Sequence, residues 1–493
     1  MGEAPLILGV SGLRGIVGES LTPEVASRYA ATFGTFMRER VERPRILLAR
    51  DGRAGGEVFA QAAASGLRSV GCDVLQGGVL TTPSAGVIAF DRGCDAALII
   101  TASHNPEDWN GIKLLLVDEE IGSGFAPGAS QAGEIVDRFR SGRVDYLTDV
   151  SEFGDEDRED PHVANLHANA VSDAVAEALG YGFEERGESG PGLAVVDSVN
   201  CSGVFASSEL LGLMLCRGVQ IFEDRFGFFP HTPEPTAENL SGEGGLRDAV
   251  PGLKADIGFA QDPDADRLAI IDENGRYIGE EYTLVLCAEA LLSAREASSD
   301  KPAIVVNLST SRMIEDVAAK HGAEVFRTPV GEANVVEKMK TLKSEECDVV
   351  LGGEGNGGVI WPEVVYIRDS LSAMALVLAL MARTGKTVSG LVADIDALSP
   401  GGKGYCIVKR KAEIPSKDAA KPAVEAVAAK YAEQKVDLQD GCRVDFDPDG
   451  PRAGTWVHVR ASNTEPIMRL ICEAPTEAIA DEVLAEVEAA IPS

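Results

Sequence analysis

The sequence predicts an α/β protein, because short β-branched runs alternate with amphipathic helical stretches along most of the chain. The strand-like segment 45–49 precedes a helical segment at 57–70, and 303–308 precedes 311–321 in the same way. Its 493 residues are enough for roughly three or four domains of ordinary size. We therefore expect three related mixed α/β domains, followed by a smaller α+β domain at the C-terminal end.

The expected domain boundaries lie where this pattern is interrupted. A polar, acidic stretch at 149–161 marks the end of the first domain, and Thr-Gly-Lys-Thr at 384–387 resembles a hinge before the last. The four expected domains are 1–155, 156–255, 256–385 and 386–493.

Each expected element has a local signature, either an apolar run for a strand or a 3.6-residue apolar period for a helix. In the second domain these signatures predict helices at 164–179 and 203–215 and strands at 192–197 and 220–223. In the third domain they predict strands at 256–260, 268–272 and 347–350 and a helix at 369–383. In the fourth domain they predict strands at 405–410, 455–460 and 467–473 and helices at 421–433 and 476–490.

Composition narrows the class of partner. The chain has 78 acidic and 45 basic residues, a net charge of −33, which argues against nucleic acid because phosphate binding needs a basic face. The longest apolar stretch, 374–381, is far shorter than the roughly 20 residues of a membrane span. Nine scattered cysteines without a Cys-x-x-Cys pair predict reduced core thiols. We expect a cytoplasmic protein, monomeric or homodimeric, that acts on a small molecule without membrane contact.

A polar loop joins the apolar run 96–100 to the run that begins at 112. It carries Ser103 and His104, and Pro106 keeps it from becoming helical. Lys113 follows ten residues after the serine and is the only lysine among the first 253 residues. Taken alone, the serine has the composition of an ordinary turn, and three other loops decide its interpretation.

Three carboxylates alternate in the second of these loops, at Asp262, Asp264 and Asp266. Hard oxygen ligands in a loop stiffened by Pro263 suit Mg²⁺ or Ca²⁺. An EF-hand is excluded, because Arg267 stands where that loop requires glycine and both flanks are strand-like.

The third loop, 351–360, satisfies the pattern Gly-x-Gly-x-x-Gly, but no helix follows it, so we discount a dinucleotide site. Its Glu354 and Asn356 suit sugar hydroxyls instead. The fourth loop follows the strand at 455–460 and offers a guanidinium and hydroxyls suited to phosphate. Its residues are Arg460, Ser462, Asn463 and Thr464.

Two shorter arginine motifs, Ser11-Gly-Leu-Arg-Gly and Arg50-Asp-Gly-Arg, are weak signals by themselves. Together the loops supply a hydroxyl, a hard-metal site, a polyol site and a phosphate site. That combination predicts phosphoryl transfer on a sugar phosphate, which depends on charge neutralisation and alignment.

Four segments resemble the signature loops of the α-D-phosphohexomutase superfamily, in the family's order and over nearly the whole chain. They are Thr101-Ala-Ser-His-Asn-Pro, Asp262-Pro-Asp-Ala-Asp-Arg, Gly353-Glu-Gly-Asn-Gly and Arg460-Ala-Ser-Asn-Thr-Glu-Pro. The resemblance implies three related mixed α/β domains and a fourth like the TATA-box-binding-protein fold, around a central cleft.

The resemblance also implies a role for each loop. Ser103 would carry a phosphoryl group, and one of its oxygens would join the three aspartates in binding Mg²⁺. Glu354 and Asn356 would bind sugar hydroxyls, and residues 460–464 the non-reacting phosphate. The residues near the transferring group would be Arg14, His104, Arg267 and Lys113, the last as general acid or base.

The implied reaction interconverts a hexose 6-phosphate and 1-phosphate through a hexose 1,6-bisphosphate. The third loop, 351–360, is called the sugar loop below. It lacks the Ser and His of many bacterial members and is most similar to that of archaeal-type phosphoglucosamine mutases. Glu332, after Pro-Val-Gly, would suit a substrate amine, so glucosamine phosphate is favoured. The alternatives are glucose or mannose phosphate as substrate, a sugar phosphatase, and a non-catalytic sugar-phosphate-binding protein.

Overall fold

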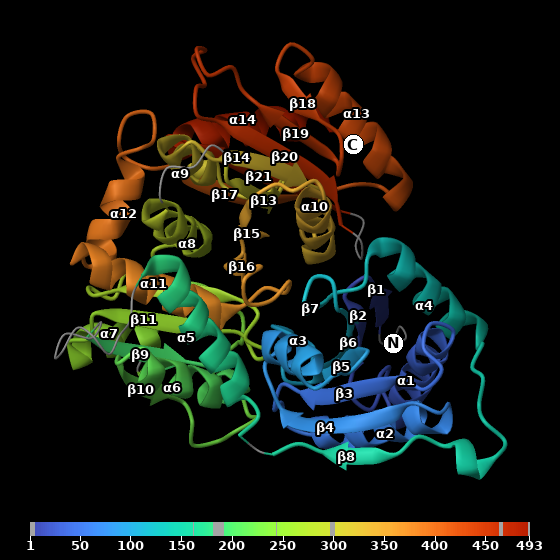
Figure 1. The fold of residues 1–493 in the computed structure, drawn as a ribbon. Helices are drawn as coiled ribbons and strands as arrows, with labels where there is room; N and C mark the ends of the chain where they lie inside the picture. The colour runs from blue at the N-terminus through green and yellow to red at the C-terminus, as the bar shows by residue number, and fades with distance from the viewer. Residues whose placement is uncertain are drawn as a thin grey trace.

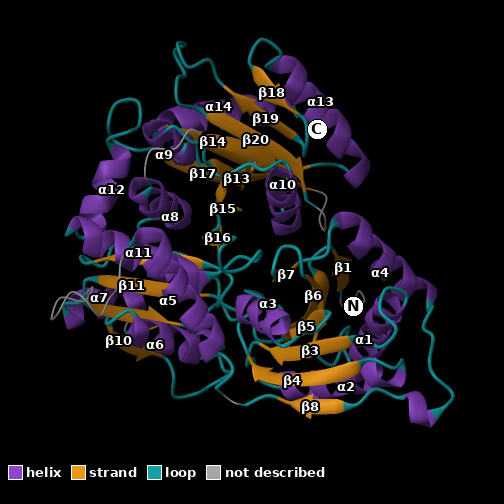
Figure 2. Cartoon of the chain, viewed as in Figure 1, coloured by secondary structure: helices purple, strands orange, loops and turns teal. Residues whose placement is uncertain are grey.

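The computed structural model describes residues 5–160, 162–180, 192–242, 244–295, 301–462 and 467–491. These residues form four sheets, each covered by helices (Figures 1 and 2). The first three sheets are mixed and the fourth is antiparallel throughout, which confirms the predicted fold class.

The first sheet has eight strands in the order β1-β2-β6-β5-β3-β4-β8, with β7 paired to β6. Its centre is β5, which is fully buried because both faces are covered by helices. The elements are β1 Leu6–Gly9, β2 Gly12–Ile16, α1 Pro23–Arg38, β3 Arg45–Arg50, α2 Gly56–Ser69, β4 Asp73–Val79, α3 Thr82–Asp91, β5 Ala96–Ile100, β6 Trp109–Asp118, β7 Ser123–Phe125, α4 Ala129–Ser141 and β8 Glu156–Arg158.

The second sheet has the order β10-β9-β11-β12. The strands at 257–261 and 268–272, which we expected to open the third domain, belong here, because β11 pairs with β9 and with β12. The expected boundary at 255 therefore differs from the structure. The elements are α5 Asn165–Leu179, β9 Leu193–Asp197, α6 Gly203–Leu213, β10 Arg217–Ile221, α7 Leu246–Leu253, β11 Ile257–Gln261 and β12 Leu268–Asp272.

The third sheet has the order β14-β13-β15-β16. Helix α12, which lies beyond the expected boundary at 385, packs into the same core as α8 and α11, so this unit extends past that boundary. The elements are α8 Glu280–Ala294, β13 Ala303–Asn307, α9 Met313–His321, β14 Glu324–Thr328, α10 Glu332–Ser344, β15 Val349–Glu354, β16 Gly358–Ile360, α11 Ser370–Thr384 and α12 Val388–Asp396.

The fourth sheet has the order β17-β21-β20-β19-β18, and α13 and α14 supply its apolar core partners. The elements are β17 Cys406–Glu413, α13 Ala420–Lys430, β18 Lys435–Asp437, β19 Cys442–Asp445, β20 Trp456–Ala461, β21 Ile467–Ala474 and α14 Glu477–Ala490.

Within the described residues, no single helix is long and apolar enough to cross a membrane. Helices α11 and α12 meet that test only as a pair bent by 88°, and nearly all of α11 is buried in the core.

Candidate active site

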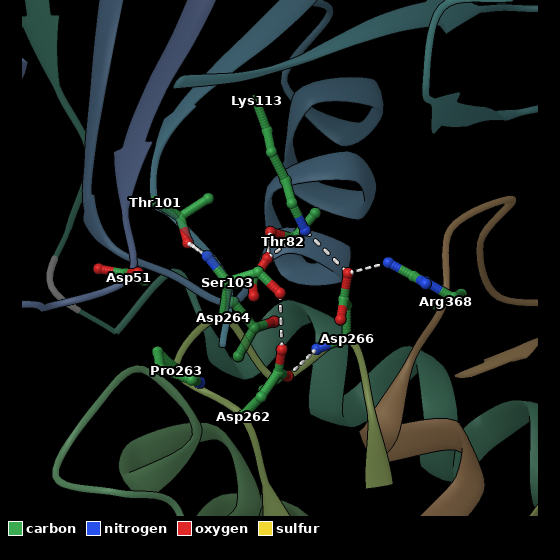
Figure 3. Close-up of polar contacts among 12 residues, drawn as sticks. Asp51, Thr82, Thr101, Ser103, Lys113, Asp262, Pro263, Asp264, Asp266 and Arg368 are labelled. Carbon is green, nitrogen blue, oxygen red and sulfur yellow. Dashed lines mark hydrogen bonds and ion pairs between the residues drawn. The ribbon is translucent and has the colours of Figure 1, made fainter. Parts of the chain in front are cut away.

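Ser103 lies in the connection between β5 and β6, as the sequence predicts. The serine is 1 % exposed and has a φ of 51°, in the left-handed region that few residues other than glycine adopt. Its backbone N–H donates to Thr101 Oγ1 at 2.9 Å, which holds this turn. The hydroxyl donates to Asp262 Oδ2 at 2.9 Å (Figure 3). The connection 101–108, which we call the serine loop, therefore contacts the connection 262–267, which we call the acidic loop.

Arg53, from one of the two weak motifs, holds the serine loop in place. Its buried guanidinium donates to the carbonyls of Ser103, Pro106 and Trp109, each at 2.7 Å. Phe229, in the loop after β10, lies over the guanidinium at 4.8 Å. The position of the hydroxyl therefore depends on contacts that reach from the first domain into the second.

The acidic loop turns between β11 and β12, so strands flank it and an EF-hand is excluded here too. Asp262, Asp264 and Asp266 are 0 % exposed, and each offers a carboxylate oxygen within 4.8 Å of the others. Burial and the neighbouring carboxylates raise the pKa of Asp262 well above its ordinary value.

Two of these buried carboxylates each have an oxygen without a hydrogen-bond partner, Asp264 Oδ1 and Asp266 Oδ1. Leaving such an oxygen unpaired in the interior is costly. Hard, buried oxygen donors in a strand-flanked loop fit a Mg²⁺ ion, which binds carboxylates and retains further positions for substrate oxygens. The residues present thus suit the predicted cation.

Lys113, on β6, reaches the acidic loop. Its Nζ donates to Asp264 Oδ2 at 2.5 Å and to Asp266 Oδ2 at 2.8 Å (Figure 3). Burial lowers the pKa of this lysine, but the charges of the two aspartates outweigh it, and the pKa is raised overall. Thr82, at the start of α3, also donates to Asp264 Oδ2, at 2.5 Å, and has no counterpart in our sequence predictions.

The remaining residues predicted near the transferring group also gather at this point. His104 Nδ1 lies 3.3 Å from Ser103 Oγ, and burial together with Arg267 and Arg14 lowers the pKa of this histidine to about 3, so the ring is neutral. Arg14 donates to Asn105 Oδ1 at 2.8 Å in the serine loop. Arg267 Nε lies 3.8 Å from Asp266 Oδ1. The hydroxyl of Ser103 therefore contacts a carboxylate and an imidazole, and Arg14 and Arg267 contact other residues of the same two loops.

The sugar loop begins at the end of β15. Glu354 is 3 % exposed, and its Oε1 accepts from Asn307 Nδ2 at 2.8 Å and from the backbone N–H of Gly331 at 3.1 Å. Asn356 lies two residues further on and accepts from the N–H of Gly358 at 3.2 Å. The carboxylate and the amide therefore lie two residues apart, at the end of β15 and in the turn to β16, and their binding of sugar hydroxyls stays a prediction.

Arg368 joins this loop to the acidic loop and is not among the residues that the sequence predicts to be functional. Its guanidinium donates to Glu354 Oε2 and to Asp266 Oδ2, both at 2.6 Å. The available signal was an arginine in an otherwise apolar stretch directly before Asp369, which caps α11. The pattern does not show where such an arginine points.

The segment predicted to bind phosphate, 460–464, is called the phosphate loop and begins at the end of β20 in the fourth domain. Arg460 is the penultimate residue of that strand, and its Nε is buried without a hydrogen-bond partner. Burial lowers the pKa of this arginine, and the charges of Asp440 and Glu354 oppose the shift. Ser462 is buried and its N–H donates to the carbonyl of Ile467. Asn463 and Thr464 lie outside the described residues.

His458 connects the fourth domain to the third, close to Arg460. Ser309 Oγ lies 2.9 Å from its Nδ1, and Nε2 lies 2.6 Å from the carbonyl of Asp440. Because the carbonyl can only accept, Nε2 carries the proton and Nδ1 accepts from the serine.

We expect His458 to make stability depend on pH. Burial lowers the pKa of this ring to about 4, so the folded chain stays neutral there while the unfolded chain binds a proton below about pH 6.5. The free energy of unfolding should therefore fall by about 1.5 kcal/mol from this residue as the pH drops from 6.5 to 5. Urea unfolding of wild type and His458→Gln at both pH values measures the difference; an identical pH dependence in the two proteins would contradict it.

Comparison with known proteins identifies the family of each domain. Four models of phosphoglucomutase/phosphomannomutase domains match the chain: the alpha/beta/alpha domains I, II and III at residues 5–138, 173–275 and 280–397, and the C-terminal domain at 406–490.

Two archaeal relatives match over nearly their whole length. A phosphoglucomutase/phosphomannomutase of Thermococcus kodakarensis is 35 % identical, with 97 % of this chain and 96 % of the relative covered. A probable phosphoglucosamine mutase of Methanopyrus kandleri is 34 % identical, with 96 % and 95 % covered. A crystal structure of a phosphoglucomutase/phosphomannomutase family protein from Burkholderia thailandensis is 25 % identical and superposes with a TM-score of 0.77, covering 98 % of this chain and 97 % of that one. The chain belongs to the phosphoglucomutase/phosphomannomutase family, within the α-D-phosphohexomutase superfamily.

Proposed function

We propose that this protein is an isomerase that interconverts hexosamine or hexose 6-phosphate and 1-phosphate through a phosphoserine at Ser103. The observation that carries the proposal is the buried hydroxyl of Ser103, 2.9 Å from Asp262 in a loop of three carboxylates that Lys113 also contacts. Phosphoryl transfer needs this combination of an aligned oxygen and surrounding charge.

The proposed reaction consists of two phosphoryl transfers. In the first, the bond between Ser103 Oγ and phosphorus breaks while an oxygen of the bound sugar monophosphate forms the new bond, which gives a hexose 1,6-bisphosphate. The sugar hydroxyl loses one proton and Ser103 Oγ gains one, and we assign this exchange to Lys113, the protonated amine at the acidic loop. In the second transfer the other phosphate returns to Ser103. The bisphosphate therefore also serves to phosphorylate enzyme that has lost its phosphoryl group.

A Mg²⁺ ion held by Asp262, Asp264 and Asp266 would neutralise charge on the transferring phosphoryl oxygens. The protein's own groups do the rest of the positioning. Arg53 holds the backbone of the serine loop, and Arg14 and Arg267 add positive charge beside Ser103. We propose that Glu354 and Asn356 bind the sugar hydroxyls.

Between the two transfers the bisphosphate must turn over, so the phosphate loop has to accept either phosphate. We propose that Arg460 makes the main charged contact there, together with Ser462, Asn463 and Thr464. Such a contact is equally strong in the bound sugar phosphate and in the transition state.

Arg460→Ala should therefore raise KM with little change in kcat, since it removes binding from both states. A charged hydrogen bond contributes about 1.5–3 kcal/mol, so we expect KM to rise about 10- to 100-fold. Steady-state kinetics measures this. Arg410→Ala is the matched control, because Arg410 lies in the same sheet and pairs with Asp481 at 2.6 Å. A fall in kcat with unchanged KM would contradict the assignment of Arg460.

We favour glucosamine phosphate as the substrate. Glu332 accepts from the N–H of Arg368 at 2.8 Å, which places a second carboxylate beside Glu354, where a substrate ammonium would be favoured. The Methanopyrus relative carries the phosphoglucosamine mutase name. Glucose or mannose phosphate is the second candidate, since the Thermococcus relative is named for both of those activities.

One comparison decides the substrate: kcat/KM for glucosamine, glucose and mannose 6-phosphates, measured in one buffer with Mg²⁺ and the matching 1,6-bisphosphate. We expect the glucosamine value to exceed the other two. Release of inorganic phosphate is followed in the same assays. Phosphate release as fast as sugar 1-phosphate formation would show a phosphatase and refute the proposed mutase.

A further inference from the structure

Arg368 bonds acids of two loops that have different proposed tasks. One terminal nitrogen of its guanidinium donates to Asp266 in the acidic loop, and the other donates to Glu354 in the sugar loop, both at 2.6 Å. Figure 3 shows the side chain reaching Asp266 from the segment that precedes α11. The two carboxylates are 88 residues apart in the chain, and this single side chain connects them directly.

The surrounding structure holds Arg368 in this position. Its backbone N–H donates to Glu332 Oε1 at 2.8 Å, and its Nε lies 3.5 Å from Glu332 Oε2. Gly358 leaves room for the stem, because a Cβ at that glycine would lie 2.2 Å from Arg368 Cδ. The side chain is one-tenth exposed, so its alternatives are limited.

The next residue, Asp369, fixes the same segment through a buried hydrogen-bonded chain to His167 and Ser84. His167 Nε2 lies 3.0 Å from Asp369 Oδ2, and His167 Nδ1 lies 2.9 Å from Ser84 Oγ on α3. Asp369 also accepts from the N–H groups of Leu371 and Ser372 at the start of α11. These buried contacts attach the Arg368 segment to the first and second domains.

The bond to Asp266 determines which oxygen of that carboxylate is available. Arg368 and Lys113 both donate to Oδ2, at 2.6 and 2.8 Å. Oδ1 is left buried and without a hydrogen-bond partner. Asp264 shows the same division, with Thr82 and Lys113 on Oδ2 and nothing on Oδ1. Arg368 therefore orients one of the two oxygens that are free for the cation.

The bond to Glu354 divides that carboxylate in a similar way. Asn307 and Gly331 donate to Oε1, whereas Arg368 donates to Oε2. A carboxylate oxygen has room for a further donor, so a sugar hydroxyl that binds Glu354 competes with or shifts the Arg368 contact. A shift of the guanidinium would change its bond to Asp266 at the same time.

We propose that Arg368 is a positioning residue that couples cation binding at the acidic loop to sugar binding at Glu354. The proposal rests on the proposed function for the identity of the two ligands. Coupling of this kind is reciprocal: the factor by which Mg²⁺ changes the affinity for the sugar phosphate equals the factor by which the sugar phosphate changes the affinity for Mg²⁺.

The test measures binding without turnover. Dephosphorylated enzyme is titrated by calorimetry with Mg²⁺ in the absence and presence of saturating glucosamine 6-phosphate, and with glucosamine 6-phosphate in the absence and presence of Mg²⁺. For wild type we expect the Kd of each ligand to change by roughly 5-fold or more when the other is bound, the lower end of typical coupling. In Arg368→Gln we expect that factor to fall to about 1, a loss of coupling by definition.

Two further variants separate coupling from loss of charge or of structure. Arg267→Gln removes a guanidinium that also lies beside Asp266 but makes no hydrogen bond to Glu354, so its coupling factor should stay within about 2-fold of wild type, although its Mg²⁺ affinity changes. Arg368→Lys restores the charge but lacks the planar fork whose two terminal nitrogens each contact one acid, so it should retain the Mg²⁺ affinity of wild type without retaining the coupling factor.

Two results would overturn the proposal: a coupling factor in Arg368→Gln equal to that of wild type, or the same loss of coupling in Arg267→Gln. If Arg368→Gln does not fold, Glu354→Gln keeps the test open, because among the described residues the hydrogen-bonded route from Glu354 to Asp266 in the acidic loop runs through Arg368. Its Mg²⁺ Kd without sugar should change at least 3-fold, and an unchanged Kd would also overturn the proposal. Absence of mutase turnover, by contrast, would refute the proposed function and leave this Mg²⁺ measurement intact.

Discussion

Replacing Ser103 with alanine should reduce mutase turnover by on the order of 10⁴-fold or more, since it removes the oxygen that carries the phosphoryl group. The fold should persist, because the side chain makes only two hydrogen-bond contacts, with Asp262 and His104, and lies in a loop that Arg53 holds through backbone carbonyls. Turnover is measured as 6-phosphate formation from the 1-phosphate, with the 1,6-bisphosphate present.

Ser123→Ala is the control for this variant. Ser123 is also a buried serine of the first domain, 2 % exposed, and its hydroxyl accepts from the N–H of Tyr366 at 3.0 Å, away from the acidic loop. It should lose stability but keep kcat. Turnover by Ser103→Ala above about one hundredth of the wild-type rate would rule out the serine as the phosphoryl carrier.

Asp264→Asn should lose both rate and Mg²⁺ dependence, and this is the second-largest effect that we expect. Asp264 supplies one of the two unpartnered oxygens of the acidic loop, and its other oxygen accepts from Lys113 and Thr82. Charge neutralisation by a bound metal is worth several kcal/mol, so we expect kcat to fall about 10²- to 10³-fold.

Activity as a function of Mg²⁺ concentration and calorimetric Mg²⁺ binding give the two readouts. Asp256→Asn is a suitable control, since this exposed carboxylate precedes β11 at the opposite end of the strand and accepts from the N–H of Leu193 at 2.8 Å. Unchanged Mg²⁺ affinity in Asp264→Asn would place the cation elsewhere.

Local sequence patterns were sufficient to predict those loops whose functional residues lie within a few positions of one another in the chain. Ser103 and the triplet at 262–266 stand out because apolar strands deliver polar residues to short turns, and the strands are found as predicted. Their contact spans 159 positions, and the pattern alone does not contain it. The family resemblance supplied that link, and the geometry agrees with it.

Residues that act across domains could not be predicted in this way. Thr82 reaches Asp264 across 182 positions, and Arg368 reaches Asp266 across 102. Each belongs to a helix start or an apolar stretch that has a local explanation of its own. The assignment of β11 and β12 failed for the same reason, because an apolar strand does not show which sheet it will join.

Locating the phosphoryl group on the protein is the most direct test of the proposed phosphoserine at Ser103. Dephosphorylated enzyme is incubated with a hexose 1,6-bisphosphate and Mg²⁺, and its mass and phosphorylated peptides are then determined by mass spectrometry. We predict one added phosphoryl group per chain, on Ser103 within the peptide that contains residues 101–113, and recovery of turnover in proportion to it. Full turnover by enzyme that carries no phosphoryl group, or carries it at another residue, would contradict the account.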